Sequence, residues 1–241
     1  MTHTDPQNSS RERLVEAAIL CFAEKGFDGA GIREIARRAR ANSALVQYHF
    51  GGKTGLYAAA LRHIFSCRPV QVSSPPEDPG QPGARAEAIR IIGAMIEALL
   101  EELMAASTGG ELDRASLLLV TRELQAPRAD MAALLLEHMR PYTDILQGCM
   151  KVLRPDLDWT AALDYTTSIY GQVVHLHNNL PLLRLLRGEP DYPKDLKTVA
   201  RHITAFSLRG IGLPEAFPES LRGDVERAKR AGGPPSVISG A

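Results

Sequence analysis

The chain has 241 residues, which is enough for one or two domains with a substantial buried core. Its 28 basic and 28 acidic side chains cancel, so overall charge does not by itself indicate a nucleic-acid partner. The three cysteines (Cys21, Cys67 and Cys149) lack metal-ligand or disulfide-framework spacing, and no apolar run approaches 18 residues. The sequence therefore predicts a soluble, cytoplasmic protein with no cofactor and no metal site.

The first predicted helix follows a capping box, Ser9-x-x-Glu12. An apolar stripe at helical spacing comes after it. The stripe consists of Leu14, Ala17, Ala18, Cys21 and Phe22. Lys25-Gly26 supplies the predicted end, because glycine readily adopts the left-handed position after a helix.

Residues 31–57 contain two short helical patterns, 33–39 and 43–50, and a Gly-Gly-Lys step that opens a third helix over 53–66. The first two patterns share one apolar side, which predicts a common buried face: Ile32, Ile35, Ala36, Ala39, Leu45, Val46 and Phe50. The outer face is basic and polar: Arg33, Arg37, Arg38, Ser43, Gln47, Tyr48, His49 and Lys53. Such a face suits docking into the DNA major groove, and an ordinary helical hairpin is the alternative.

Charge is unevenly distributed along the chain. Residues 1–68 carry 10 of the 28 basic residues but only 6 of the 28 acidic ones, which gives +4 there and leaves −4 for the rest. A basic first domain and an acidic remainder fit a DNA-binding domain joined to a domain with another partner. Residues 69–83 hold five prolines and two glycines, so they predict a long loop between the two.

The remainder predicts helices throughout, so the expected fold class is all-α. The expected helices are 84–106, 113–125, 127–153 with Pro141 kinking or dividing it, 158–186 with a kink or break at Pro181, and 193–210. Residues 231–241 have no periodicity and predict a disordered tail. The expected domains are 1–68, the loop 69–83, and a helical body over 84–230.

Residues 11–61 closely resemble the helix-turn-helix of the TetR (tetracycline repressor) class of bacterial transcription regulators. The resemblance lies in RERLVEAAILCFAEKGFDGAG, IREIARRA, LVQYHFGGK and Leu56-Tyr57, in that order. Two positions depart from the family pattern. Gly31 stands where Thr or Ser is usual, which removes a hydroxyl that caps a helix and touches a phosphate, and Arg40 stands where Gly is usual in the turn. In the body, RELQAP, the His138-to-Pro141 step, SIYGQ and HITAFSLRGI resemble the CecR/CerR-like subgroup.

The resemblance implies that helix 43–50 enters the major groove. The implied DNA-contacting residues are Arg33, Ser43, Ala44, Gln47, Tyr48, His49 and Lys53. Gln47 is the best base reader, since its amide both donates and accepts as adenine recognition requires. The implied phosphate contacts are Tyr48, His49, Lys53 and Arg33, and Arg38 and Arg40 are further candidates. Tyr48 and His49 could instead pack on the first helix, and Arg37 and Arg38 could form a plain solvated face.

The resemblance also implies a homodimer and a small-molecule pocket in the body. The last two long helices are the dimer candidates, with Gly171 allowing close approach and Leu176, Leu180, Ile203, Phe206 and Leu208 supplying apolar area. These residues could equally belong to the protomer core. The candidate ligand-binding residues are polar groups at otherwise apolar positions: His138, Tyr142, Gln172, His175 and Asn178. Polar residues satisfied within the core are the alternative.

The leading hypothesis is a ligand-responsive transcriptional repressor that binds double-stranded operator DNA and releases it when a small molecule binds. An enzyme is not expected, because no nucleophile elbow, phosphate-binding glycine loop or metal constellation is present. A thiol-responsive regulator using one of the three cysteines is the further alternative. Cys21 falls on the buried stripe, which favours inert packing for that residue.

Overall fold

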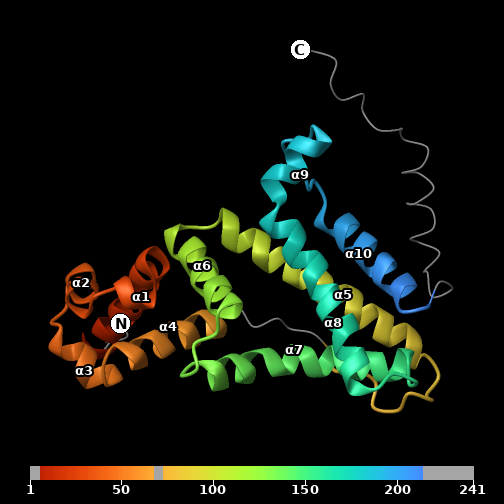
Figure 1. The fold of residues 1–241 in the computed structure, drawn as a ribbon, viewed down its shortest axis with the longest axis horizontal. Helices are drawn as coiled ribbons and strands as arrows, with labels where there is room; N and C mark the ends of the chain where they lie inside the picture. The colour runs from red at the N-terminus through yellow and green to blue at the C-terminus, as the bar shows by residue number, and fades with distance from the viewer. Residues whose placement is uncertain (1–5, 68–72, 214–241) are drawn as a thin grey trace, which may run out of the picture. The chain divides into compact units, whose positions relative to one another are not determined.

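The computed structural model describes residues 6–67 and 73–213, with side chains from Ser10 onward. The predicted tail 231–241 lies outside the described residues. Within them the chain forms ten helices and no strand, which confirms the all-α prediction (Figure 1). None of these helices has the length and apolar character needed to cross a bilayer. The helices group into two compact units, one containing residues 6–67 and 102–141 and the other residues 73–101 and 142–213.

The first unit contains five whole helices. They are α1 (Pro6–Gly29), α2 (Ile32–Arg38), α3 (Ala44–Phe50), α4 (Lys53–Cys67) and α6 (Glu111–Gln125). Helix α1 begins at Pro6, because proline is favoured in the first turn, where no N–H partner is needed. Ser9 therefore lies inside the helix, and the prediction that it caps α1 is wrong. Gly26, with φ of +71° and ψ of 177°, breaks the helical backbone where the sequence predicted an end.

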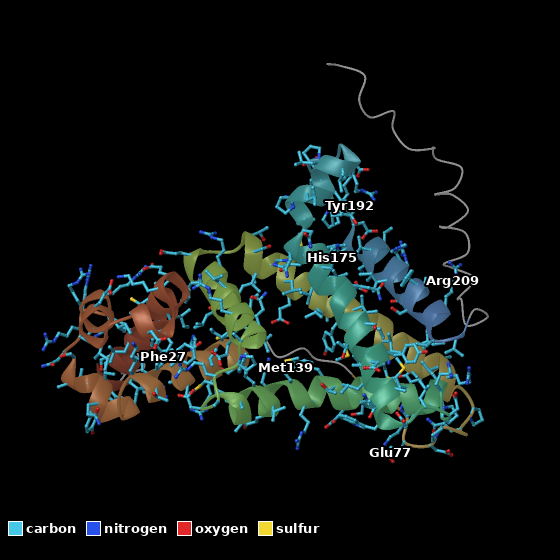
Figure 2. The ribbon with its side chains drawn as sticks, in the orientation of Figure 1. Phe27, Glu77, Met139, His175, Tyr192 and Arg209 are labelled. Atoms are coloured by element: carbon cyan, nitrogen blue, oxygen red, sulfur yellow. The ribbon has the colours of Figure 1, made fainter. Side chains whose placement is uncertain are left out.

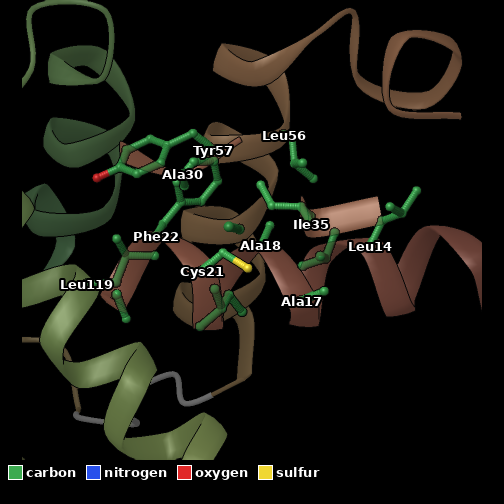
Figure 3. Packing of buried hydrophobic residues seen from close by; sticks show 14 of the residues in the cluster. Leu14, Ala17, Ala18, Cys21, Phe22, Ala30, Ile35, Leu56, Tyr57 and Leu119 are labelled. Atoms are coloured by element: carbon green, nitrogen blue, oxygen red, sulfur yellow. The ribbon is translucent and has the colours of Figure 1, made fainter. Parts of the chain in front are cut away.

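Helix α1 is the centre of this unit and packs against α2, α3, α4 and α6. Its predicted apolar stripe is fully buried, with Leu14, Cys21 and Phe22 at 0% exposure. Figure 3 shows these side chains meeting Ile35, Leu56 and Tyr57, and Leu119 of α6 closes the same cluster. Burial of several large apolar side chains at about 1.5–3 kcal/mol each fixes the short helices α2 and α3, which could not persist alone.

The second unit is built from the first part of α5 (Ala84–Thr108), the second part of α7 (Ala132–Leu153) and three further helices. These are α8 (Trp159–Asn178), α9 (Leu180–Arg187) and α10 (Leu196–Gly210). Helix α7 continues through Pro141 and starts five residues after Pro127, later than expected. The expected helix 158–186 is divided at Asn179, so Pro181 falls in the first turn of α9.

The two units do not follow the expected division into 1–68 and 84–230. Helix α6 belongs with the N-terminal helices, because Leu119 and Glu123 are buried in that unit. The apolar series Leu112, Ala115 and Leu119 sets this face of α6 against α1. The first unit therefore includes α6, which begins more than 40 residues beyond the end of α4 in the sequence.

A tight backbone contact joins α3 to α4. Gly51 ends α3 in the left-handed conformation (φ 67°, ψ 16°), and Gly52 has φ of 118°. Gly55 lies in the first turn of α4, where a Cβ atom would come within 1.8 Å of the Phe50 carbonyl oxygen. Only glycine leaves room for that carbonyl, so the sequence Gly-Gly-Lys-Thr-Gly fixes the angle between the two helices.

We expect Gly55→Ala to lower the free energy of unfolding by about 2–3 kcal/mol, because the backbone must move to admit the methyl group. Gly93→Ala in α5 is the matched control, since its Cβ would lie 3.6 Å from Thr204 Oγ1, an ordinary contact. Its stability should stay within about 1 kcal/mol of the wild type, with helix propensity favouring alanine. Urea melts of both variants test this, and similar melts would contradict it.

Candidate nucleic-acid interface

The turn between α2 and α3 is set by backbone hydrogen bonds. Ala41 N–H donates to the Ala36 carbonyl at 2.9 Å, and Arg40 N–H donates to that of Arg37 at 3.1 Å. This pair of bonds is the Schellman arrangement, and it requires a left-handed residue at Arg40, whose φ is +50°. Arginine therefore occupies the left-handed position of this turn, where the resemblance implied glycine. The backbone strain falls on Arg40.

Both short helices lack the usual hydroxyl cap. Gly31 precedes α2 with an extended backbone (φ −96°, ψ 140°) and has no side chain to accept an N–H bond. At α3, Ser43 makes no capping bond. The Asn42 Oδ1 accepts the Ala44 N–H at 2.9 Å instead, which caps α3 and leaves the Ser43 hydroxyl uninvolved in capping.

Helix α3 presents one polar face to solvent. Val46 is buried and Leu45 and Phe50 are partly buried against the core, whereas Ser43, Ala44, Gln47 and Tyr48 are exposed. Tyr48 is 74% exposed, although its ring meets the His49 ring edge-on with centroids 4.9 Å apart. Exposed amide, hydroxyl and methyl groups on one side of a two-turn helix can reach base edges in a major groove.

The cations around this face fall into two groups. Arg38 is engaged by Glu24 at 2.5 Å and by Glu111 at 3.0 Å, and the hydrogen bond with Glu24 raises the pKa of Arg38. In contrast, Arg33, Arg37 and Arg40 are exposed and form no ion pair with the described residues. These three arginines can reach DNA phosphates, whereas Arg38 is committed to α1 and α6.

Lys53 and His49 are less accessible than the sequence analysis expected. The Lys53 ammonium donates to the Asp28 carbonyl at 3.1 Å and lies 4.8 Å from the centre of the Phe27 ring. It therefore joins the start of α4 to the end of α1. The Nε2 atom of His49 is buried and has no hydrogen-bond partner among the described residues. A phosphate cannot reach that atom in this conformation.

The predicted ligand-binding residues are divided between the units. His138, in the first unit, stacks on Phe65 with centroids 3.7 Å apart, and burial lowers its pKa. In the second unit, Gln172 Nε2 donates to Ser207 Oγ at 3.0 Å and so connects α8 to α10. Tyr142 is half-buried there, whereas two further candidates are exposed: His175, which is labelled in Figure 2, and Asn178.

Sequence reasoning did not identify two polar residues that the structure buries, Gln147 and Glu123. Gln147 of α7 is 6% exposed, and its Nε2 atom has no hydrogen-bond partner within the described residues. Glu123 of α6 is 2% exposed and accepts a hydrogen bond from Tyr57. The signal for Glu123 was its position, because it continues the buried series of Leu112, Ala115 and Leu119 at helical spacing.

Comparison with known proteins agrees with this arrangement. Residues 14–60 match the family of bacterial regulatory proteins described as the tetR family. Residues 93–211 match the C-terminal domain of the HTH-type transcriptional dual regulator CecR. Both matches describe transcription regulators, so the expectation that the chain is not an enzyme is confirmed.

Similar individual proteins align mainly through the N-terminal helices. "Probable HTH-type transcriptional regulator YttP" of Bacillus subtilis is 44% identical over 58 residues, which make up 24% of this chain and 26% of that protein. The repressor NicS of Pseudomonas putida is 33% identical over 57 residues, 24% of this chain and 27% of NicS. The chain thus spans about a quarter of either relative's length.

A solved structure shares the fold over most of the chain. The TetR transcriptional regulator of Agrobacterium tumefaciens superposes with a TM-score of 0.55. The superposition covers 90% of this chain and 98% of that one, at 21% identity. The fold is therefore common to both proteins.

We expect Arg40→Gly to be more stable than Arg40→Ala by about 0.5–1 kcal/mol, because both variants lose the charge and only glycine relieves the left-handed backbone. Urea melts of the two variants measure the difference directly. Equal stability would mean that Arg40 carries no strain.

Proposed function

We propose that this chain, which belongs to the TetR family of bacterial regulators, is a repressor that binds operator DNA as a homodimer and releases it when a small molecule binds. The observation that carries the proposal is the exposed polar face of α3. The left-handed turn at Arg40 precedes this helix, and the contact of Gly55 with the Phe50 carbonyl follows it, so both ends of α3 are held in place. Binding bacterial DNA would place the protein in the cytoplasm. The name of NicS as a repressor supports repression over activation.

In the proposed complex, α3 lies in the major groove and each residue has a distinct role. Gln47, in the middle of the exposed face, hydrogen-bonds a base edge, while Ser43 and Ala44 contact neighbouring bases. Arg33 and Tyr48 contact phosphates and set the register. Lys53 retains N–H groups for a phosphate beyond its bond to Asp28, whereas the buried Nε2 atom of His49 makes that residue a weaker candidate.

The dimer interface is proposed on the exposed faces of α8 and α10. Most of the apolar residues expected at this interface are buried within the protomer, where α8 packs against α10. Leu176, Leu180, Ile203 and Leu208 are at most 9% exposed. Phe206 is 61% exposed, and Val174 is 41% exposed. A Cβ atom at Gly171 would have no neighbour within 4 Å, so the small size of this residue serves nothing within the described protomer.

Helix α9 also exposes apolar residues. Its exposed residues include three large leucines: Leu182 at 52%, Leu185 at 80% and Leu186 at 65%. Exposed apolar patches of this kind in soluble proteins mark association surfaces. In the proposed dimer, the two α3 helices would bind successive major grooves of the operator, about 34–36 Å apart.

The effector is proposed to bind in the second unit. Gln147 offers a buried amide donor without a partner among the described residues, which suits a ligand with a hydrogen-bond acceptor. This residue is a better candidate than the exposed His175 and Asn178. The side-chain amide of Gln172 already donates to Ser207 Oγ, which agrees with the alternative that Gln172 is a polar residue satisfied within the core. Effector binding would favour a spacing of the α3 helices that no longer fits the operator.

A thiol response is the second candidate, and it now rests on one residue. Cys67 is exposed, and its Sγ lies 3.6 Å from Nε2 of His63. Cys21 and Cys149 are buried, and burial raises the pKa of Cys149 to about 12, so neither is a ready thiolate. Mass spectrometry after mild peroxide, paired with DNA affinity, separates this function from small-molecule sensing.

The function is tested by selecting bound fragments from a DNA library and measuring affinity at several salt concentrations. Gln47→Ala should cost about 1–3 kcal/mol at one operator position and relax the base preference there. Lys53→Ala should weaken binding to all sequences and reduce the salt slope by about one unit per protomer.

Because Lys53 also bonds to Asp28, thermal melts must accompany the Lys53→Ala measurement. Arg33→Ala is the comparison variant: Arg33 is an exposed cation without an ion pair among the described residues, so its loss should weaken binding to all sequences without lowering the melting temperature. A flat salt response of the wild type would exclude specific operator binding as proposed. Base preference altered by Lys53→Ala, and not by Gln47→Ala, would mean that the docking register is wrong.

The dimer interface is tested with Gly171→Leu, which should weaken self-association because a large side chain would separate closely packed helices. The protomer itself has room for the change, so its fold should persist. Ala86→Leu, at an exposed site on α5, is the control for added apolar area. Analytical ultracentrifugation that finds Gly171→Leu as dimeric as the wild type would place the interface elsewhere.

A further inference from the structure

An arginine of α1 lies beside the end of α3. The Arg11 guanidinium carbon is 5.5 Å from the centre of the Phe50 ring, and Phe50 is the last residue of α3. Arg11 is exposed and makes no ion pair with the described residues. The sequence analysis did not include Arg11 among the DNA-contacting residues, because it lies well before the helix-turn-helix in the chain. Its place in the fold therefore gives it a surrounding that its place in the sequence did not indicate.

The neighbouring Arg13 shows the contrast. Its Nε atom donates to the Ala39 carbonyl at 3.1 Å, at the residue that ends α2. That bond satisfies a carbonyl at a helix end, so Arg13 serves the fold. The contact of Arg11 is of another kind, because a ring face attracts a cation but accepts no strong hydrogen bond. The N–H donors of the Arg11 guanidinium are consequently available to an acceptor outside the described chain.

Phe50 places this cation at the edge of the exposed face of α3. Phe50 follows Gln47 by three residues, and side chains at that spacing are neighbours on a helix, with Cβ atoms about 5–6 Å apart. Gln47 is exposed, whereas Phe50 is partly buried against the core. The Phe50 ring therefore lies at the border between the buried and the exposed side of α3, and Arg11 lies at that same border.

Helix α3 depends on other elements for positive charge. It contains no arginine or lysine itself. The three unpaired arginines described above come from α2 and from the turn before α3. Beyond the end of α3, the Lys53 ammonium already donates to the Asp28 carbonyl. Because a helix in the major groove has a phosphate backbone on either side, cations are useful at both its ends. Arg11 supplies one at the end of α3.

We propose that Arg11 is a DNA-contacting residue: its guanidinium, held against the Phe50 ring, binds a phosphodiester oxygen of the operator backbone beside the end of α3. This contact would extend the DNA-binding surface from the helix-turn-helix to α1. Since every nucleotide carries the same phosphate, Arg11 contributes to affinity and register and not to base preference. The inference rests on the proposed function, and it is independent of the effector site.

Two substitutions of Arg11 and one control test the proposal. Arg11→Gln removes the charge, whereas Arg11→Lys keeps the charge and loses the planar fork of donors. Arg140→Gln is the matched control, because Arg140 is an exposed arginine of α7 in the same unit, and its loss changes the net charge equally. Affinity for selected and for random DNA is measured at several salt concentrations. Melting temperatures of all four proteins accompany these measurements.

Arg11→Gln should bind both DNAs about five- to tenfold more weakly per protomer at about 0.1 M salt, with a salt slope reduced by about one unit per protomer. Arg11→Lys should keep the wild-type slope, and Arg140→Gln should change neither affinity nor slope. An unchanged slope for Arg11→Gln would overturn the proposal. An equal loss in Arg140→Gln would also overturn it, because the effect would then be one of net charge.

Uncharged methylphosphonate linkages, placed one at a time in the selected operator, locate the contact. Wild-type protein should lose affinity at the phosphate that Arg11 binds, whereas Arg11→Gln should lose none there, because that contact is already missing. The absence of any such position would contradict a direct contact. If the wild type binds selected and random DNA equally, the repressor function fails, and the salt slopes on random DNA still decide the role of Arg11. Binding to neither DNA would overturn both.

Discussion

The exposed face of α3 depends on a backbone contact with α4, because α3 is too short to hold its orientation alone. Helix α3 has seven residues, fewer than an isolated helix needs in water. Its direction comes from its ends: Arg40 closes the preceding turn, and the Phe50 carbonyl fits against Gly55. Positions of single atoms in these two turns therefore decide where Gln47 and its neighbours point.

The basic residues of the first unit have two different roles, which the net charge does not distinguish. Arg38 and Lys25 pair with acidic residues and hold α1 and α2 together, while Arg33, Arg37 and Arg40 extend into solvent. A phosphate backbone would meet the second group, so the excess of +4 over residues 1–68 is not a count of DNA contacts. Glu123 of α6 adds a buried carboxyl group to the same unit, where its two hydrogen bonds compensate for lost hydration.

The sequence was most informative about features that depend on the apolar periodicity of a single helix. The apolar spacing of Leu14, Phe22, Ile35 and Val46 correctly predicted which face of each helix is buried, because that periodicity lies within single helices. Contacts between distant segments could not be predicted in this way. The placement of α6 beside α1 and the pairing of Tyr57 with Glu123 join residues far apart in the chain, 66 positions in the second case. Leu176 and Ile203 show the same limit, since an apolar helix face does not reveal whether its partner is the same chain or another copy.

The unequal burial of the three cysteines has a practical consequence for locating the first unit of each chain in the proposed dimer. Cys21 and Cys149 are enclosed in the two units, whereas Cys67 is exposed at the end of α4, in the same unit as α3. A thiol-directed spin label would therefore attach at one place per chain without any engineered cysteine. In a two-fold assembly, a single label–label distance would then report the spacing of the two reading helices in solution, with and without DNA.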